Sequence, residues 1–475
     1  LAQATQDTGQ QCISTIKANY QQPCWKFIDD VANLIMKILL TWRGLKKSLI
    51  QKLSYEKNFT MTLASLNPDI VVIGAGTSGL SSAKSLKEFG YSVIVIEANS
   101  DVGGRCITNN SIFDTPFDLG GSWLHSAATN PLANIAIKKN AKLHKKNWSP
   151  TWVHSNGRDL SPQETKEYSQ YIEDMWKNIN NIGARKADLS VEKLIPKSKW
   201  KDIAKNQISL MLAADPDVSS ALDVFHFTNT KGDWLIESGL GTFIKNIYSD
   251  IKVFVNCPAS KIDYSSSGVK VETPQGIINA KYAVLTVSTG VLAREQIKFY
   301  PALPPRKQEA INLLPIGLLN KIGLEFDPRW KGAHQGQSAD YLIGKNDFCS
   351  IEFGFCDSNI AVGFVGGRFA EQLEMDGPGT ATSFCLDSLK AIFGNDIVKF
   401  IHKTTETAWK SNKNTHGSYS YAVPGGHGAR QTLAEPLDDR LFFAGEATMS
   451  NTQATVHGAY LSGIEVAEKI SKIDK

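Results

Sequence analysis

The sequence predicts an α/β fold with a parallel sheet near its start, a second, discontinuous α+β domain and a helical N-terminal extension. Three observations support this prediction. A buried β-branched run near residue 70 is followed by glycines and an amphipathic helix. Residues 141–234 have few glycines and helical periodicity. Short alternating strands then follow, and the chain ends with another strand, a glycine and a helix.

The first unit begins with the apolar run Ile70 to Ile73, which predicts a buried parallel strand. It leads into Gly74, Gly76 and Gly79, spaced as G-x-G-x-x-G. These glycines permit a tight turn, the approach of a pyrophosphate and close packing of the next helix. The helix, predicted from Gly79 to Gly90, presents N–H groups that can bind an anion.

A second predicted strand, Val93 to Ile96, delivers Glu97 about twenty residues after the glycines. A carboxylate there suits two ribose hydroxyls and would repel a 2′-phosphate. The alternative is a glycine-rich turn without a ligand, but strand, glycines, helix, strand and acid arrive in the order of a Rossmann-type dinucleotide site. The following Gly104 and Arg105, in the run Gly-Gly-Arg, resemble the second glycine motif of flavoproteins. At this point the chain resembles the flavin-dependent amine oxidase superfamily, which implies a glutathione reductase-like fold and FAD rather than NAD.

The resemblance is most specific in the run from Phe117 to His125, which has the form seen in polyamine oxidases of the spermine oxidase type. It implies that Gly121 and Ser122 lie against the flavin and that Trp123 and His125 face the substrate. His125 has an equal alternative as a hydrogen-bonded structural histidine.

Lys321 lies on an alternating strand predicted from residues 317 to 324. Without the family it would be interpreted as a solvated edge lysine, because lysine is normally exposed. The resemblance implies a catalytic residue that holds a water against flavin N5. Burial there would lower its pKa, since desolvation disfavours the ammonium.

The last third of the sequence is expected to supply the other wall of the site. The resemblance places Tyr419 beside the flavin's substrate face, with Trp409 and Ala259 also at the cofactor. Thr455 stands where plant apoplastic and monoamine types have a tyrosine, which leaves a wider substrate slot.

A strand ending in Gly445 and Glu446 precedes a helix that starts near Thr455 and Val456. Helix N–H groups can stabilise negative charge on a reduced flavin. No cysteine lies between Glu446 and His457, whereas monoamine oxidases carry their flavin-linking cysteine in this region. The FAD is therefore expected to be non-covalent.

The predicted FAD-binding domain comprises residues 64–140, 235–298 and 432–475, and the substrate domain comprises residues 141–234 and 299–431. Residues 1–63 are expected to be an extension with an amphipathic helix from Ile28 to Leu49. Its apolar face is compatible with packing on the enzyme, with an anionic membrane surface or with a protein partner. Cys12 and Cys24 are close enough in sequence to pair in an oxidising compartment, and the first residues favour export weakly.

Composition narrows the functional classes. The 475 residues are 42% hydrophobic and 21% charged, with a net charge of only +4, so nothing calls for nucleic acid as a partner. The nine histidines and seven cysteines show no metal-ligand spacing, so no metal is expected.

The resemblance implies oxidation of an amine, with a polyamine such as spermine or spermidine favoured. Hydride transfer to flavin N5 would leave an imine that water hydrolyses, and O2 would reoxidise the flavin to give H2O2. The alternatives are a flavin desaturase or protoporphyrinogen-type oxidase, a monoamine oxidase-like enzyme, and a non-catalytic flavin-binding partner. The oligomeric state is not predicted, and among compartments a secreted or periplasmic one is favoured only weakly.

Overall fold

The computed structural model describes residues 67–145, 149–184, 188–230 and 232–474, and residues 66–475 form one compact unit. The predicted extension lies outside the described residues, together with its helix, Cys12 and Cys24. The predicted boundaries between the FAD-binding and substrate domains stay a prediction.

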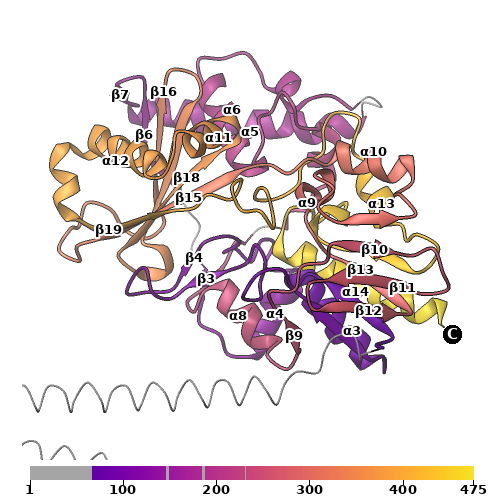
Figure 1. Ribbon diagram of the computed structural model, residues 1–475. Coiled ribbons are helices and arrows are strands. Elements are labelled where there is room, and N and C mark those ends of the chain that lie inside the picture. Colours follow the sequence, from indigo (N-terminus) through magenta and orange to yellow (C-terminus); the bar gives the residue numbers. More distant parts are fainter. Residues whose placement is uncertain (1–66, 146–148, 185–187, 231, 475) are drawn as a thin grey trace, which may run out of the picture. The chain divides into compact units, whose positions relative to one another are not determined.

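A five-stranded, fully parallel sheet forms the first part of the fold (Figure 1). Its first two strands have the predicted bounds, and their side chains are almost entirely buried, as expected for a parallel sheet. The strand order is β20 (Leu441–Phe443), β13 (Tyr282–Leu285), β1 (Ile70–Ile73), β2 (Val93–Ile96) and β9 (Val253–Phe254). The C-terminal strand therefore lies one strand away from β1, across β13.

The first and last helices of this part, α3 (Thr77–Glu88) and α14 (Val456–Ile473), pack closely against each other. Gly463 permits the contact, because a Cβ at this position would lie 2.1 Å from the Ser81 hydroxyl oxygen. Ser78 and Ser462 hydrogen-bond across the interface at 3.0 Å. The two ends of the described chain are thereby held side by side.

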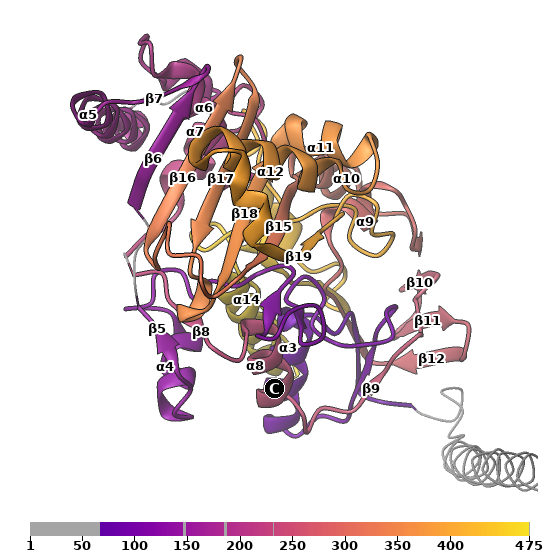
Figure 2. The ribbon, with the colours of Figure 1, turned by 90° about the vertical axis from the view of Figure 1, so that its left-hand side faces the viewer.

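A seven-stranded mixed sheet forms the second part (Figure 2). Its order is β19 (Ile401–Glu406), β15 (Leu319–Phe326), β18 (Ile360–Gly366), β17 (Asp347–Phe353), β16 (Gln337–Ile343), β6 (Ser149–Ser155) and β7 (Arg158–Asp159). One face packs on α11 (Gly367–Met375) and α12 (Thr380–Phe393) through a cluster that includes Ile322, Ile351 and Leu389. The opposite face contains Phe364 and Val362, which pack with Phe113 and Phe117.

The predicted helical insertion is helical only in part. Its helices are α5 (Pro162–Asn180), α6 (Lys201–Leu212) and α7 (Ala221–His226). Residues 143–144, 149–155 and 158–159 instead form strands, and β6 pairs in parallel with β16 of the large sheet. Periodicity did not reveal this pairing, because a parallel partner almost two hundred residues away leaves no local pattern.

Smaller elements complete the fold. A four-stranded sheet has the order β12 (Gly276–Ala280), β11 (Val269–Thr273), β10 (Lys261–Asp263) and β14 (Lys298–Tyr300). Two-stranded pairs join β3 (Thr108–Asn109) to β4 (Phe117–Asp118), and β5 (Leu143–His144) to β8 (Leu235–Ile236). The remaining α-helices are α4 (Pro131–Lys138), α8 (Leu240–Ile247), α9 (Thr289–Ala293), α10 (Pro305–Leu313) and α13 (Ala429–Ala434). No helix in the described ranges is both long and apolar enough to cross a bilayer.

Candidate active site

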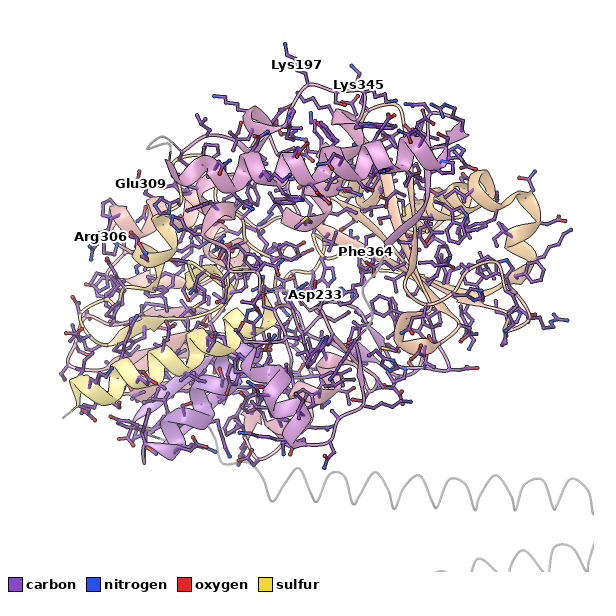
Figure 3. The ribbon with its side chains drawn as sticks, turned by 180° about the vertical axis from the view of Figure 1, so that it is seen from behind. Lys197, Asp233, Arg306, Glu309, Lys345 and Phe364 are labelled. Carbon is purple, nitrogen blue, oxygen red and sulfur yellow. The ribbon has the colours of Figure 1, made fainter. Side chains whose placement is uncertain are left out.

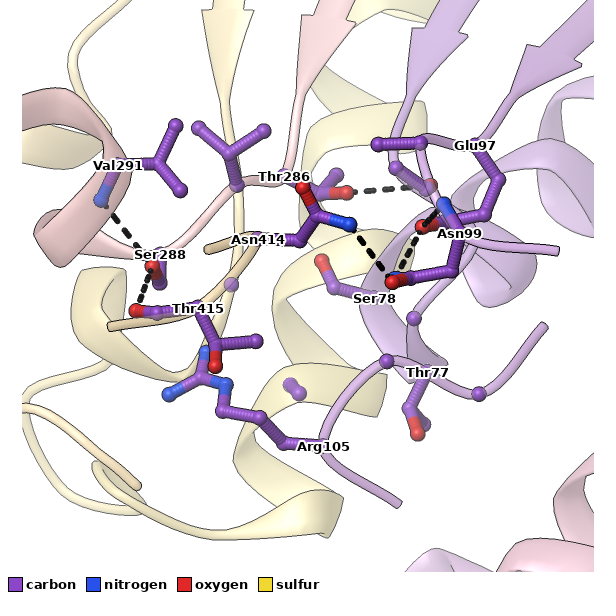
Figure 4. Close-up of a pocket in the computed structure, with 18 of the residues that line it drawn as sticks. Thr77, Ser78, Glu97, Asn99, Arg105, Thr286, Ser288, Val291, Asn414 and Thr415 are labelled. Carbon is purple, nitrogen blue, oxygen red and sulfur yellow. Dashed lines mark hydrogen bonds between the residues drawn. The ribbon is translucent and has the colours of Figure 1, made fainter. Parts of the chain in front are cut away.

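A cavity of about 410 Å³ lies at the carboxyl ends of the parallel strands (Figure 4). This volume is within the range of cofactor sites. Most of the sequence-predicted cofactor residues and two of the substrate residues line it. They are Gly74, Gly76, Glu97, Gly104, Arg105, Gly121, Ala259, Tyr419, Gly445, Glu446, Thr455 and Val456.

The glycine turn has the conformation that its spacing predicts. Gly74 has φ +103°, which favours glycine, and a Cβ there would lie 2.6 Å from the Thr286 hydroxyl. Gly79 does not line the cavity, but a Cβ at this position would lie 1.9 Å from the Gly74 carbonyl oxygen. Its role is therefore to bring α3 close to β1 and fix the turn.

Two glycines leave open space on the cavity side. Around Gly76 the nearest atom to a hypothetical Cβ is 4.0 Å away, and the same is true of Gly445. Since both residues line the cavity, a side chain at either would project into space that a ligand can use. Bare backbone at these two points is what a pyrophosphate requires in order to approach a helix N-terminus.

Glu97 ends β2 and is buried in the cavity wall. One carboxylate oxygen accepts from the Ala75 N–H at 2.7 Å, and the other accepts from the backbone and side chain of Asn99. Asn414, from a distant loop, donates to the Asn99 side chain at 2.7 Å (Figure 4). This bond links two segments 315 residues apart at the edge of the cavity.

Arg105 and Glu446 form an ion pair of 2.7 Å in the cavity wall. Glu446 also accepts from the Ser420 backbone and hydroxyl. Burial opposes its charge, but Arg105 and Arg430 leave the pKa of Glu446 below its ordinary value. Glu446 is therefore ionised and fixed, and Arg105 lines the cavity beside it.

The last helix directs its N-terminus at the cavity. Thr455 is its N-cap and accepts from the Gly458 N–H at 2.9 Å. Gly121 packs so closely on Val456 that a Cβ would lie 2.5 Å from a methyl carbon of that valine. The N-termini of α3 and α14 both line the cavity, which suits a ligand with negative charge at two points.

These features fit FAD. One end has Glu97 for ribose hydroxyls, the glycine turn suits a pyrophosphate, and the α14 N-terminus suits the electron-rich edge of a flavin. Ala259 lines the cavity, and its contact with the adenine stays a prediction. Among the described residues, no group of three or more His, Cys, Asp or Glu side chains could hold a metal ion.

Lys321 lies on β15 with its ammonium group buried beside the Asp118 to Ser122 turn. The Nζ atom donates to the carbonyl oxygens of Asp118 at 3.0 Å and Gly120 at 2.6 Å, and to the Ser122 hydroxyl. Burial lowers the pKa of Lys321 to about 8, although Asp118 and Glu352 oppose this effect. Lys321 is thus not the solvated edge lysine of the alternative interpretation.

Asp118 lies on the same turn, and its carboxyl group interacts electrostatically with Lys321. Its carboxylate accepts from the Thr108 hydroxyl and from the N–H groups of Leu240 and Gly241 at the start of α8. Burial raises the pKa of Asp118, while Lys321 and these donors lower it. The turn that carries the predicted flavin contacts Gly121 and Ser122 is therefore held at two points. The Asp118 carboxyl group ties it to the start of α8, and Lys321 donates hydrogen bonds to it.

Trp123 and His125 follow on the same segment, outside the lining of the cavity. Their ring centroids are 6.4 Å apart, and Trp123 makes an edge contact with Phe355. His125 Nδ1 lies 3.0 Å from an Asp233 carboxylate oxygen. Burial opposes ionisation of Asp233, but the bond to His125 leaves the pKa of Asp233 below its ordinary value. His125 therefore has a hydrogen-bond partner, as its structural interpretation requires, and about two-fifths of its side chain is exposed.

The two aromatic residues from the last third of the sequence have different positions. Tyr419 lines the cavity, and its hydroxyl donates to the Leu210 carbonyl at 2.9 Å, which fixes the ring. Trp409 is buried behind the 119–120 backbone and donates to the Leu119 carbonyl at 3.1 Å. Trp409 thus supports the turn without lining the cavity.

Sequence reasoning missed several residues around the site. Asn99 and Asn414 line the cavity, and Asp233 and Glu352 lie among the charged groups near His125 and Lys321. In the view of Figure 3, Asp233 lies near the centre and Lys197 projects from the edge. None of these acids or amides stands in a motif, so only tertiary structure brings them to the site.

The fold and the cavity define a dinucleotide-binding α/β protein, and comparisons with known proteins give its family. The family described as flavin containing amine oxidoreductase matches residues 77–471. Polyamine oxidase 2 of Arabidopsis thaliana is 30% identical over 435 residues, covering 85% of this chain and 88% of the relative.

Two further matches differ in kind. Lysine-specific histone demethylase 1 homolog 2 of A. thaliana is 30% identical over 439 residues, which cover 84% of this chain but 58% of the relative. A solved structure of a putrescine oxidase double mutant, redesigned in cofactor binding, has a TM-score of 0.69 at 20% identity. It aligns with 86% of this chain and 100% of its own and shows the shared fold.

The chain belongs to the flavin-containing amine oxidoreductases. It is a flavin-containing amine oxidase, and its cofactor is FAD. The expected family, cofactor and fold class are therefore confirmed.

Proposed function

We propose that this enzyme oxidises a polyamine such as spermine or spermidine at a carbon next to nitrogen, with release of an aldehyde, an amine and H2O2. The relative of matching length is named a polyamine oxidase. The observation that carries the proposal is Lys321, a buried basic group held against the turn of Gly120 and Ser122.

Bound FAD supplies the redox chemistry, because it accepts a hydride from the amine and passes the electrons to O2. The protein supplies orientation and a site with little water. The charged form of Lys321 uses all three N–H donors on Asp118, Gly120 and Ser122. A water molecule can therefore bind Lys321 in two ways. It donates to the lone pair of the neutral amine, or it replaces one of the three acceptors of the ammonium group.

The aromatic residues orient the substrate. The fixed ring of Tyr419 presents an apolar wall at the cavity, and Trp123 lies on the turn that reaches Ser122. Such faces guide a methylene chain and stabilise a cationic nitrogen further along it. The reacting nitrogen itself must be neutral, because its lone pair is needed as the hydride leaves, so we expect turnover to increase with pH.

We also propose that FAD is held without a covalent bond. The segment between Glu446 and His457 offers no cysteine, and ion pairs and helix N-termini surround the cavity instead. Acid precipitation of the purified enzyme should release all of its flavin into the supernatant. Yellow colour that stays in the pellet would contradict this proposal.

A peroxide-coupled assay tests the substrate. The panel contains spermine, spermidine, acetylated polyamines, putrescine, monoamines and a peptide with methylated lysine, the last because demethylase homologues are among the relatives. We expect fastest turnover of a polyamine. Preference for the peptide or for monoamines would replace the proposed substrate class. Enzyme that binds FAD but turns over no amine would favour desaturase-type chemistry or a binding role.

A further inference from the structure

A second cavity, of about 360 Å³, lies at one end of the large mixed sheet. Strands β15 and β17 end there, and β16 and β18, which lie beside them in the sheet, begin there (Figure 2). Phe326, which lines the cavity, ends β15 five residues beyond Lys321, about 17 Å along an extended strand. None of the described residues that line this cavity also lines the FAD cavity, so the two sites are separate.

Three aromatic residues line this second cavity. Phe326 and Phe353 are buried, and Trp330 stacks on Phe326 with 4.5 Å between the ring centroids and 22° between the ring planes. The Trp330 and Phe353 centroids are 5.9 Å apart. Ile360 and Ala361, at the start of β18, add aliphatic surface. The wall therefore suits a ligand with a flat apolar body.

Gln335 is the polar residue that the fold leaves unsatisfied in this wall. The residue as a whole is partly exposed, but its Nε2 and Oε1 atoms are both buried, and neither has a hydrogen-bond partner among the described residues. Gln337, in contrast, accepts from the His334 N–H at 2.7 Å. Gly354 has φ +69°, and a Cβ there would lie 2.7 Å from the Gln335 Cα, so the two backbones are in contact. A buried amide without partners is costly, which indicates a ligand that offers both a donor and an acceptor.

The carboxylates that line the cavity have partners within the protein. Asp327 accepts from the Arg329 guanidinium at 2.9 Å and lies 3.3 Å from His402 Nε2. The hydrogen bonds from Arg329 leave the pKa of Asp327 below its ordinary value. Asp357 lies 2.9 Å from His144 Nδ1. These two acids therefore do not require a cationic ligand.

We propose that this cavity binds a neutral, flat aromatic molecule with an amide-type edge, in which an N–H donor stands beside a carbonyl or ring-nitrogen acceptor. The edge would form two hydrogen bonds with Gln335, as a glutamine does when it pairs with adenine, and the ring would pack on the aromatic wall. Aromatic carboxamides and nucleobases share this edge. The site goes beyond amine oxidation and does not depend on the proposed substrate.

The test is calorimetric titration of the enzyme saturated with FAD, so that the cofactor site is filled. The probes are benzamide, 9-methyladenine and acetophenone, which has the ring and carbonyl of benzamide but a methyl group in place of the NH2. We expect benzamide to bind at least about tenfold more tightly than acetophenone, because acetophenone leaves Gln335 Oε1 buried and unpaired. Tighter binding of benzamide or of 9-methyladenine supports the site and identifies the source of its ligand.

Two variants of Gln335 locate the binding. Gln335→Leu keeps a side chain of similar size without donor or acceptor, so it should lose the preference for benzamide over acetophenone. Its thermal unfolding midpoint should equal or exceed that of the wild type, because it buries no unpaired amide. Gln335→Glu should shift the preference at least about tenfold toward benzamidine, whose edge carries two donors and a positive charge. Gln372→Leu, at an exposed glutamine of α11 outside the cavity lining, is the matched control and should bind like the wild type.

Three results would overturn the proposal. Equal wild-type affinity for benzamide and acetophenone would show that the Gln335 amide recognises neither probe. Absence of binding by all three probes would mean that water alone satisfies this amide. A preference for benzamide that survives Gln335→Leu would place the binding elsewhere. The comparison of probes on the wild type needs no folded variant, and none of these results bears on which amine the enzyme oxidises.

Discussion

Replacing Lys321 with methionine separates two contributions of this lysine to the free energy of unfolding: the cost of burying its charge and the gain from its hydrogen bonds. Methionine has a similar length and shape but no charge and no donor. The substitution removes the hydrogen bonds to Asp118, Gly120 and Ser122, which are three for the ammonium and at most two for the neutral amine. The buried charge contributes a term that depends on pH.

The magnitude follows from the pKa of Lys321, which burial lowers from 10.5 to about 8. Below pH 8 the folded protein carries the full cost of the buried ammonium, about 3 kcal/mol. Between the two pKa values the unfolded chain binds more protons than the folded one, so the free energy of unfolding rises with pH. The wild type should therefore gain about 2 to 3 kcal/mol over Lys321→Met from about pH 7.5 to about pH 10. Glu352 acts in the same direction, because loss of the lysine charge raises its folded-state pKa further in the variant.

The assay is equilibrium urea unfolding of both proteins with excess FAD, followed by circular dichroism and by flavin fluorescence. Coincident transitions establish two-state unfolding. The difference between the two proteins cancels the titration of groups that they share. A difference that is flat or decreases with pH would refute the placement of a charged lysine in a low-dielectric interior.

Two further substitutions test the cavity and the fold. Gly79→Ala should abolish flavin binding, because its Cβ would lie 1.9 Å from the Gly74 carbonyl oxygen. Gly428→Ala is the control, since a Cβ there would have nothing within 4 Å, and this variant should purify with its yellow flavin. Equal flavin content in the two variants would contradict the role of Gly79. Arg430 is fully buried and pairs with Asp223 at 2.6 Å, so Arg430→Met should cost about 3 to 5 kcal/mol and lower the midpoint of thermal unfolding. The double variant with Asp223→Leu should recover most of that loss, and a single variant as stable as the wild type would be inconsistent with the buried pair.

The parts of the fold that the sequence predicts well depend on local patterns. The strands at Ile70–Ile73 and Val93–Ile96 have the predicted bounds, because fully buried parallel strands are short apolar runs between clear turn signals. Glu97 lies in the cavity as predicted, since a strand end fixes its position. The burial of Lys321 and the resulting lowering of its pKa followed from the family resemblance, not from the strand pattern.

The residues that escaped prediction depend on pairing between distant strands. Glu352 looks like an ordinary acid on an alternating strand, and only its register with β18 turns it toward Lys321. Asp233 comes to His125 from 108 positions away. Trp409, predicted at the cofactor, is outside the lining of the cavity, and its indole N–H bonds to the Leu119 carbonyl. In each case the sequence specifies the residue, and long-range packing decides what it faces.

The cavity wall comes from three stretches of chain, roughly residues 73–121, 257–297 and 413–459. Of these three stretches, the one with the glycine turn is translated first and the one with the N-terminus of α14 last. FAD can therefore be enclosed only after all three stretches have been translated. A chain cleaved before β20 would lack Gly445, Glu446 and the N-terminus of α14, and its nucleotide site would be incomplete.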